Sequence, residues 1–308
     1  MRKAAEYMST FTILVDTSCD LPREYIEKHS IQIIPIPFNI DGIQHSFGNW
    51  QEIKDKEFYN ALRDGSVAGT ALINPEAYAR VFSEYAERGE SLLAITLSGG
   101  LSGTYQNSVI ALDEVRGKYP GCDIYSVDSV NAAGGVGLLT TLAVKKRSEG
   151  LGAGETAAWL EDKKNSCLAL FTVDDLMYLH RGGRLSKLSA VPGSIIGITP
   201  LLNVAPDATL KLKDKSRGRK GSLERLFNQM KRSLKPDTKL DTVIISHTDC
   251  VSDAEKLAAM IKSSVNIREI FIEMMGPVIG AHVGPGAVAL FFEADMTRVE
   301  YEKRFYGK

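Results

Sequence analysis

The chain has 308 residues, of which 44% are hydrophobic and 24% are charged, and its formal net charge is −1. This near-neutral balance excludes a chain-wide basic surface of the kind that binds nucleic acid or acidic membranes. No apolar run approaches the roughly 20 residues that a membrane-spanning helix needs. The length favours two domains, and the first residues lack the apolar core of a secretion signal, so we expect a cytoplasmic protein.

The cysteines and histidines indicate neither a disulfide framework nor a metal site. Cys19, Cys122, Cys167 and Cys250 are scattered and contain no C-x-x-C pair, which a zinc site or redox motif would show. The five histidines form no ligand-like cluster either. We expect reduced thiols and no bound metal.

The first half of the chain alternates between strand-like and helix-like segments. Such alternation is typical of a mostly parallel sheet with helices on both faces. The predicted strands are 12–15, 31–40, 91–97 and 123–127, with a hairpin turn at 41–42 leading into 43–45, and the predicted helices are 22–29, 53–62, 75–88, 102–116, 134–149 and 153–164.

The pattern of predicted elements changes after about residue 165, where strands become more frequent. The predicted strands are 168–173, 242–246, 269–273 and 287–292, and a hairpin joins 201–204 to 209–212. A short helix is predicted between 173 and 181, and further helices lie near 220–235 and 252–263. We therefore predict an α/β protein with two α/β domains. Residues 1–165 form an N-terminal domain with a mostly parallel sheet and flanking helices, and residues 166–308 form a C-terminal domain with a mixed sheet and helices.

The segment Asp16-Thr17-Ser18-Cys19-Asp20 follows the first predicted strand. Ligands in open α/β sheets bind at the carboxyl ends of strands, so this segment is a candidate binding loop. Aspartate, serine and threonine are also the usual residues of Asx-turns and helix caps. We favour the helix cap with an Asx-turn.

The most informative segment runs from Ser98 to Asn107 and follows the apolar strand 92–97. Its serines, threonine and glycines lead directly into a predicted helix, where backbone N–H groups and the helix dipole favour an anion. Because hydroxyl groups add further donors, the loop is predicted to hold a carboxylate or phosphate without using a charged side chain.

Two other segments are candidates for ligand contacts. His282 lies in a predicted loop, 275–286, that is rich in glycine and proline; its imidazole either packs structurally or donates a hydrogen bond to a carboxylate. The loop 181–184 reads Arg-Gly-Gly-Arg. Its arginines either pair with Asp174 or Asp175 at the surface or recognise a phosphate or an acidic partner.

Several enzyme classes lack their motifs. There is no Walker loop, which argues against a self-contained nucleotide kinase. The glycines at 150–154 follow a predicted helix and not a strand, so they do not form a dinucleotide fingerprint. The segment 100–104 misses the G-x-S-x-G elbow by one position, but a serine hydrolase using Ser102 and His282 stays open.

Four segments together resemble one known family. They are 13–22 (ILVDTSCDLP), 98–106 (SGGLSGTYQ), 178–186 (YLHRGGRLS) and 280–287 (GAHVGPGA), and they span nearly the whole chain. In this order they are similar to the DegV family, bacterial fatty-acid-binding proteins that act as carrier subunits of fatty-acid kinase.

The resemblance implies a lipid in a tunnel between two α/β domains. Its carboxylate would be held by Thr70, Ser98 and His282, and Ser102 of the same serine-containing loop is a further predicted ligand contact. A separate kinase subunit would phosphorylate the bound acid, a step with which the resemblance associates Arg184. The protein would then be a carrier and not an enzyme, with a long-chain acid such as palmitate as its ligand, the kinase subunit as its partner, and no cofactor, nucleic acid or membrane insertion.

The chain departs from the family pattern near the expected head group. It reads Gly-Thr-Ala-Leu-Ile-Asn-Pro at 69–75, where the family has Thr-Ser-Gln-Pro, and Gly99 replaces a serine. Both changes remove hydroxyl groups. They leave open a carrier for a different small anion.

Overall fold

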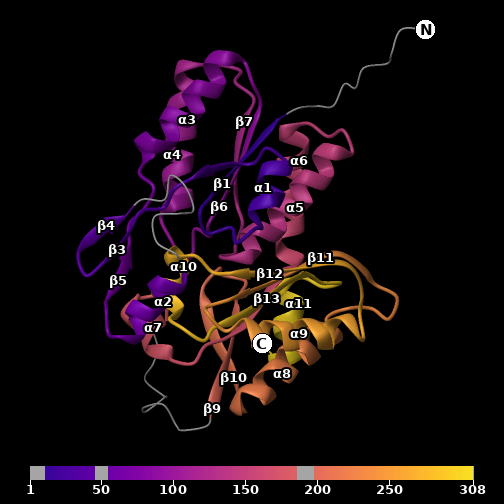
Figure 1. Cartoon of the computed structure of the whole chain (residues 1–308). Helices are drawn as coiled ribbons and strands as arrows, with labels where there is room; N and C mark the ends of the chain where they lie inside the picture. The colour runs from indigo at the N-terminus through magenta and orange to yellow at the C-terminus, as the bar shows by residue number, and fades with distance from the viewer. Residues whose placement is uncertain (1–10, 46–54, 186–197, 308) are drawn as a thin grey trace.

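The computed structural model describes residues 11–45, 55–185 and 198–307 (Figure 1). The strands are β1 (Thr12–Asp16), β2 (Gln32–Ile34), β3 (Phe38–Ile40), β4 (Ile43–His45), β5 (Ala68–Thr70), β6 (Leu92–Thr96), β7 (Ile124–Asp128), β8 (Cys167–Thr172), β9 (Ile198–Val204), β10 (Leu210–Arg217), β11 (Lys239–His247), β12 (Asn266–Met274) and β13 (Val288–Glu293). The helices are α1 (Arg23–Lys28), α2 (Asp55–Arg63), α3 (Pro75–Arg88), α4 (Thr104–Lys118), α5 (Gly134–Ser148), α6 (Ala153–Lys163), α7 (Leu176–Arg181), α8 (Gly218–Arg232), α9 (Val251–Lys262), α10 (Pro277–Val283) and α11 (Arg298–Tyr306).

The first half builds a parallel sheet, as predicted. Sheet A has the strand order β2-β1-β6-β7, and every pair in it is parallel. Because side chains alternate along a strand, Ile13 and Val15 of β1 pack on the face of α5 and α6, whereas Leu14 packs on the face of α3 and α4. Helices thus cover both faces of this sheet.

The segment predicted as one strand at 31–40 is split between two sheets. Its first part, β2, pairs with β1, whereas its second part, β3, forms an antiparallel sheet B with β4 and β5. Pro35 and Pro37 stand between the two parts, and proline has no N–H to continue a ladder. Strand β5 was not predicted, because Ala-Gly-Thr shows no apolar alternation.

The second half builds a mixed sheet, which is also confirmed. Sheet C has the order β10-β9-β8-β13-β11-β12, and only the β11–β12 pair is parallel among its described pairs. Residues of α8, α9 and α11 pack on one face of this sheet. Helix α5 packs on the other face, against β8, β11 and β13.

Helix α5 therefore lies between the two large sheets, as Figure 1 shows. Residues 134–144 are buried without interruption. Gly134 permits the close approach, because a β-carbon there would lie 2.5 Å from the side chain of Ile244.

The strands of sheet A precede residue 165 and those of sheet C follow it, but the largest hydrophobic cluster contains residues from both sheets. The division into two domains at this point stays a prediction.

Two helices were not predicted. Helix α10 occupies part of the glycine- and proline-rich segment that we expected to be a loop, and α11 is mostly polar, so apolar periodicity is weak there. The start of α11 is marked instead by a capping box of Thr297 and Glu300.

The four cysteines are free thiols. No helix in the described part of the chain is long and apolar enough to cross a membrane.

Candidate functional site

A largely apolar cavity lies between the loops that follow sheet A and the inner face of sheet C. It encloses about 740 Å³ of atom-free space, part of which is open to solvent. Its apolar lining comes from both halves of the chain: Ile36, Ala71, Leu97, Leu101, Ala132, Ala133, Ala169, Phe171, Leu179, Val204, Leu210, Met275, Val278, Ile279, Val283, Ala289 and Phe291.

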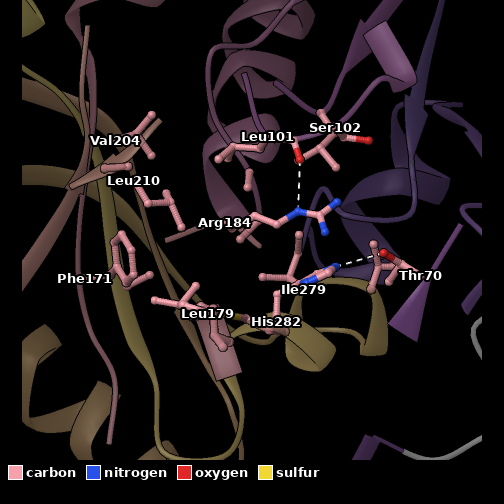
Figure 2. Close-up of a pocket in the computed structure, with 18 of the residues that line it drawn as sticks. Thr70, Leu101, Ser102, Phe171, Leu179, Arg184, Val204, Leu210, Ile279 and His282 are labelled. Carbon is pink, nitrogen blue, oxygen red and sulfur yellow. Dashed lines mark hydrogen bonds between the residues drawn. The ribbon is translucent and has the colours of Figure 1, made fainter. Parts of the chain in front are cut away.

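Four polar residues complete the lining: Thr70, Ser102, Arg184 and His282. Figure 2 shows Phe171, Val204 and Leu210 on the side of sheet C, with Thr70 on the opposite side of the cavity. The cavity is thus amphipathic, with an apolar wall and a polar end. This is the arrangement that a ligand with a long apolar part and one polar group requires.

Thr70 and His282 meet at the polar end, although 212 residues separate them in the sequence. The Thr70 hydroxyl, at the end of β5, lies 2.8 Å from Nε2 of His282 on α10. Helix α10 starts with Pro277 and ends at Val283, and the C-cap residue Gly284 has a φ of +69°. A β-carbon at Gly284 would collide with the ring of Tyr178, so the end of α10 packs closely on α7.

The imidazole of His282 is neutral at physiological pH. Its burial, and secondly the positive charge of Arg184, lower its pKa to about 4. Nδ1 is buried and has no hydrogen-bond partner among the described residues. The ring therefore carries one proton, and Nε2 is the nitrogen that takes part in the hydrogen bond with Thr70.

Arg184 brings a positive charge to the polar end. Its Nε donates to the carbonyl of Leu101 at 3.2 Å (Figure 2). Its Nη1 donates to the carbonyl of Gly182 at 2.5 Å. Burial lowers its pKa, but a guanidinium stays protonated in proteins. Since it has five N–H donors, three stay available to an anion. The sequence led us to expect a site without a charged side chain, whereas Arg184 lines this cavity.

The loop after β6 does not present its backbone donors to the cavity. The N–H groups of residues 98–102 all have acceptors inside the protein: the Asn131 carbonyl, the Asp128 carboxylate, and the hydroxyl and carbonyl of Ser98. Ser98 is fully buried and is not among the residues that line the cavity. Ser102 does line it. The predicted backbone anion cradle is therefore not the arrangement seen here.

The segment Asp16–Asp20 contains the expected Asx-turn but does not cap a helix. The Ser18 N–H donates to Oδ1 of Asp16 at 3.0 Å. Helix α1 has Pro22 as its N-cap residue, without a side-chain hydrogen bond. The predicted cap is therefore wrong, and the segment has another role.

That role is to fix three segments of the cavity wall. The contacts are Asp16 Oδ2 with the Leu97 N–H (2.6 Å), Thr17 Oγ1 with the Ile36 N–H (3.0 Å) and Asp20 Oδ1 with the Gly276 N–H (3.4 Å). Leu97 and Ile36 line the cavity, and Gly276 precedes the helix that bears His282. Sequence alone shows the acceptors here, but it does not show which distant N–H groups they meet.

A serine hydrolase is not supported by this geometry. Such an enzyme needs the nucleophile hydrogen-bonded to its base and the base oriented by a third group. Here the Ser102 hydroxyl bonds to that of Thr104 at 2.9 Å, whereas His282 bonds to Thr70. The depressed pKa of His282 also makes it a weak base.

The arginines of the 181–184 loop do not pair with the carboxylates considered from the sequence. Asp175 caps α7, and Asp174 pairs with Arg219 at 3.4 Å. Arg181 instead stacks over the ring of Tyr178, and its guanidinium carbon lies 4.7 Å from the ring centre.

Across the ranges that the structure describes, no group of three or more potential metal ligands occurs.

Sequence comparison identifies relatives along almost the whole chain. A family model described as "Uncharacterised protein, DegV family" matches residues 10–295. A DegV domain-containing protein of Clostridium perfringens is 39% identical over 289 residues, which cover 94% of this chain and 99% of the relative.

Solved structures with the same fold include lipid-binding proteins. A DegV lipid binding protein from Thermotoga maritima has a TM-score of 0.81 at 29% identity and covers 94% of this chain and 100% of its own. A second Thermotoga maritima protein, described as having a fatty acid binding function, has a TM-score of 0.79 at 30% identity, with coverages of 92% and 99%. The Streptococcus pneumoniae fatty acid kinase (Fak) B3 protein, loaded with linoleic acid, has a TM-score of 0.78 at 19% identity, with coverages of 93% and 100%, and at that identity it shows the fold alone. The chain belongs to the DegV family.

Proposed function

We propose that this protein binds a long-chain fatty acid, with the alkyl chain along the apolar wall and the carboxylate at Thr70, Arg184 and His282. The observation that carries the proposal is a cavity lined by seventeen apolar residues and four polar ones. Fatty acid and lipid binding by the two Thermotoga maritima relatives supports it.

The energetics favour a long chain over a small anion. Each buried methylene contributes roughly 0.8 kcal/mol, whereas removing a carboxylate from water costs several kcal/mol even when it is paired. Five or more methylenes offset that cost, so affinity rises with chain length until the cavity is full. A short anion lacks this contribution.

The head-group contacts follow from the protonation of His282. In the tautomer with the proton on Nε2, the imidazole donates to the Thr70 oxygen, and the Thr70 hydroxyl is then free to donate to the carboxylate. The three unused N–H groups of Arg184 supply charge-assisted hydrogen bonds. Ser102 lies in the same lining and adds a hydroxyl. The Ser98 hydroxyl accepts a hydrogen bond from the Gly100 N–H. It would have to turn away from Gly100 to reach the ligand, so this contact stays a prediction.

The protein then acts as a cytoplasmic carrier that presents the carboxylate to a kinase subunit. A carboxylate oxygen attacks the γ-phosphorus of a nucleoside triphosphate held by the partner. The new oxygen–phosphorus bond forms as the bond to the departing nucleoside diphosphate breaks. The chain has no Walker motif of its own, the fold matches the Fak B3 protein, and Arg184 stands at the proposed carboxylate.

Native mass spectrometry of protein purified from bacteria, followed by lipid analysis of the released ligand, tests the proposal. The expected result is a long-chain acid at one molecule per chain. An apo mass that stays unchanged when palmitate is added would contradict it. Release of a small non-lipid anion would favour the alternative carrier instead.

A further inference from the structure

Helix α11 lies outside the part of the chain that the DegV family model matches. The match ends at residue 295, and α11 spans Arg298–Tyr306. The helix packs on the face of sheet C opposite α5. Since Phe171 and Phe291 of the cavity wall pack on the α5 face, sheet C separates α11 from the cavity. The family match therefore leaves the role of this helix unassigned.

Arg298, the first residue of α11, carries a buried positive charge. It is 2% exposed, and no carboxylate lies within salt-bridge distance of it among the residues that the structure describes. Glu302, one turn later, instead accepts from Asn203 at 2.7 Å and pairs with Lys213 at 2.6 Å. Burial lowers the pKa of Arg298 to about 10, so the guanidinium is charged at neutral pH. Because a buried charge without a counter-ion costs free energy, ion pairing does not explain this arginine.

The guanidinium of Arg298 joins two strands that line the cavity. Nη1 donates to the Val204 carbonyl at 3.0 Å, and Nη2 donates to the Cys167 carbonyl at 2.6 Å. The described ladder between β8 and β9 ends with the pair Leu170–Asn203, and both carbonyls lie beyond that pair. The planar, forked guanidinium thus connects the two strands where their own ladder has ended.

We propose that Arg298 is a positioning residue for the alkyl chain of the ligand, acting from α11 through Val204. This inference rests on the proposed function. Figure 2 shows Val204 and Leu210 on the side of the cavity opposite Thr70, where the carboxylate is proposed to lie. The two side chains therefore face the distal methylenes of a long acid. Leu210 pairs with Val204 across the β9–β10 ladder, so a shift of Val204 moves both.

The second carbonyl limits the effect of Arg298 to the apolar wall. The Cys167 carbonyl also accepts from Nδ2 of Asn131 at 3.1 Å, and the Asn131 carbonyl accepts from the Ser98 N–H at 2.9 Å. If Arg298 is replaced, Asn131 still holds the Cys167 carbonyl. The loop that contains Ser98 therefore keeps its contacts, whereas the Val204 carbonyl loses this donor.

Calorimetric titration of the full chain with palmitate and laurate tests this role. The two acids differ by four distal methylenes, each of which raises the affinity about fourfold when buried, so wild-type protein should prefer palmitate by up to about 200-fold. Arg298→Met removes the donors and should lower that preference about tenfold, as if roughly two methylenes left the wall. Laurate affinity should change by less than about twofold. A purely structural role would lower the melting temperature and leave the preference unchanged.

Tyr301→Phe is the matched control on the same helix. The Tyr301 hydroxyl donates to Oε1 of Gln229 on α8 at 2.5 Å, so its loss weakens the packing of α11 without removing a donor to β8 or β9. This variant should have a lower melting temperature and the wild-type preference. Arg298→Lys keeps the charge and one donor group for the two carbonyls, so it should show an intermediate preference, and it is the test variant if Arg298→Met does not fold.

The outcomes separate the positioning role from the proposed function. A selective loss of palmitate affinity in Arg298→Met, or in Arg298→Lys if only that variant folds, supports the role. If wild-type protein binds palmitate but the variant weakens both acids equally or neither, if Tyr301→Phe has the same effect, or if neither Arg298 variant folds, the role is wrong and the carrier function stands. Failure of wild-type protein to bind palmitate contradicts the carrier function itself.

Discussion

Gly182 packs directly against His282: a β-carbon on residue 182 would lie 2.5 Å from Nδ1 of the imidazole. The glycine is needed for space and not for its conformation, because its φ of −70° suits any residue. The loop that bears Arg184 and the helix that bears His282 are thus held together at this contact.

Gly182→Ala should displace the imidazole and disrupt its hydrogen bond to Thr70. We expect palmitate affinity, measured by titration, to fall about 5- to 150-fold, because losing a buried hydrogen bond costs about 1–3 kcal/mol. Gly117→Ala on α4 is the control, since a β-carbon there meets nothing within 4 Å. Unchanged palmitate binding by Gly182→Ala would show that the position of His282 does not matter for the ligand.

Thr70→Val should impair binding while preserving side-chain shape. The substitution removes the hydroxyl that joins His282 to the proposed carboxylate, and it leaves Nε2 of His282 without its partner. Palmitate binding should weaken by about 1–3 kcal/mol, whereas Thr70→Ser should stay close to wild type. Equal affinities of the valine and serine variants would remove Thr70 from the head-group site.

Asp16→Ala should alter the head-group environment from outside the cavity. Without the carboxylate, the Leu97 N–H loses its acceptor and the wall segment after β6 shifts. The carboxyl signal of bound [1-¹³C]palmitate should move, as seen by NMR, and Asp16→Asn should restore part of the change because its amide oxygen still accepts. Leu226→Ala, at a buried core position of α8, should lower the melting temperature without moving the signal. The same signal in Asp16→Ala and wild type would refute the role assigned to Asp16.

Protonation of His282 should make the protein less stable as the pH falls. Its pKa is about 4 in the folded protein, against an ordinary value of 6.5, so between these values the unfolded chain binds the additional proton. The stability contributed by the neutral imidazole is present above about pH 6.5 and declines toward pH 4. Melting temperatures of wild type and His282→Gln, compared at pH 7 and pH 5, should show a larger decline in wild type. A constant difference between the two proteins would contradict this.

Sequence patterns were sufficient for the two large sheets, but not for sheet B or for the site. Apolar runs such as 92–97 predicted buried parallel strands, because a strand covered on both faces is apolar throughout. The hydrogen bond between Thr70 and His282 depends on packing across 212 residues, and only the resemblance to the DegV family pointed to that pair. Helix α10 did have a signal, Pro277 at its first position, which its glycines obscured.

The loop 98–102 shows why donors alone do not define an anion site. Its composition correctly indicated a strand end leading into a helix. Whether its N–H groups are free depends on acceptors from Asp128 and Asn131, which come from another part of the chain. The same limit applies to Arg184, whose direction depends on the carbonyl of Leu101, 83 residues away in the sequence, as well as on that of the nearby Gly182.

The position of α5 restricts how a ligand can enter. Moving the two large sheets apart would expose buried side chains of α5, such as Leu138, Leu139 and Leu142, to water. Exposing each of these side chains costs roughly 1.5–3 kcal/mol of free energy. We therefore expect loading and release to leave α5 packed between the two sheets. A ligand would then enter at the polar end, where α10 packs on β5 and α7, so the entrance and the proposed head-group site would be formed by the same short segments.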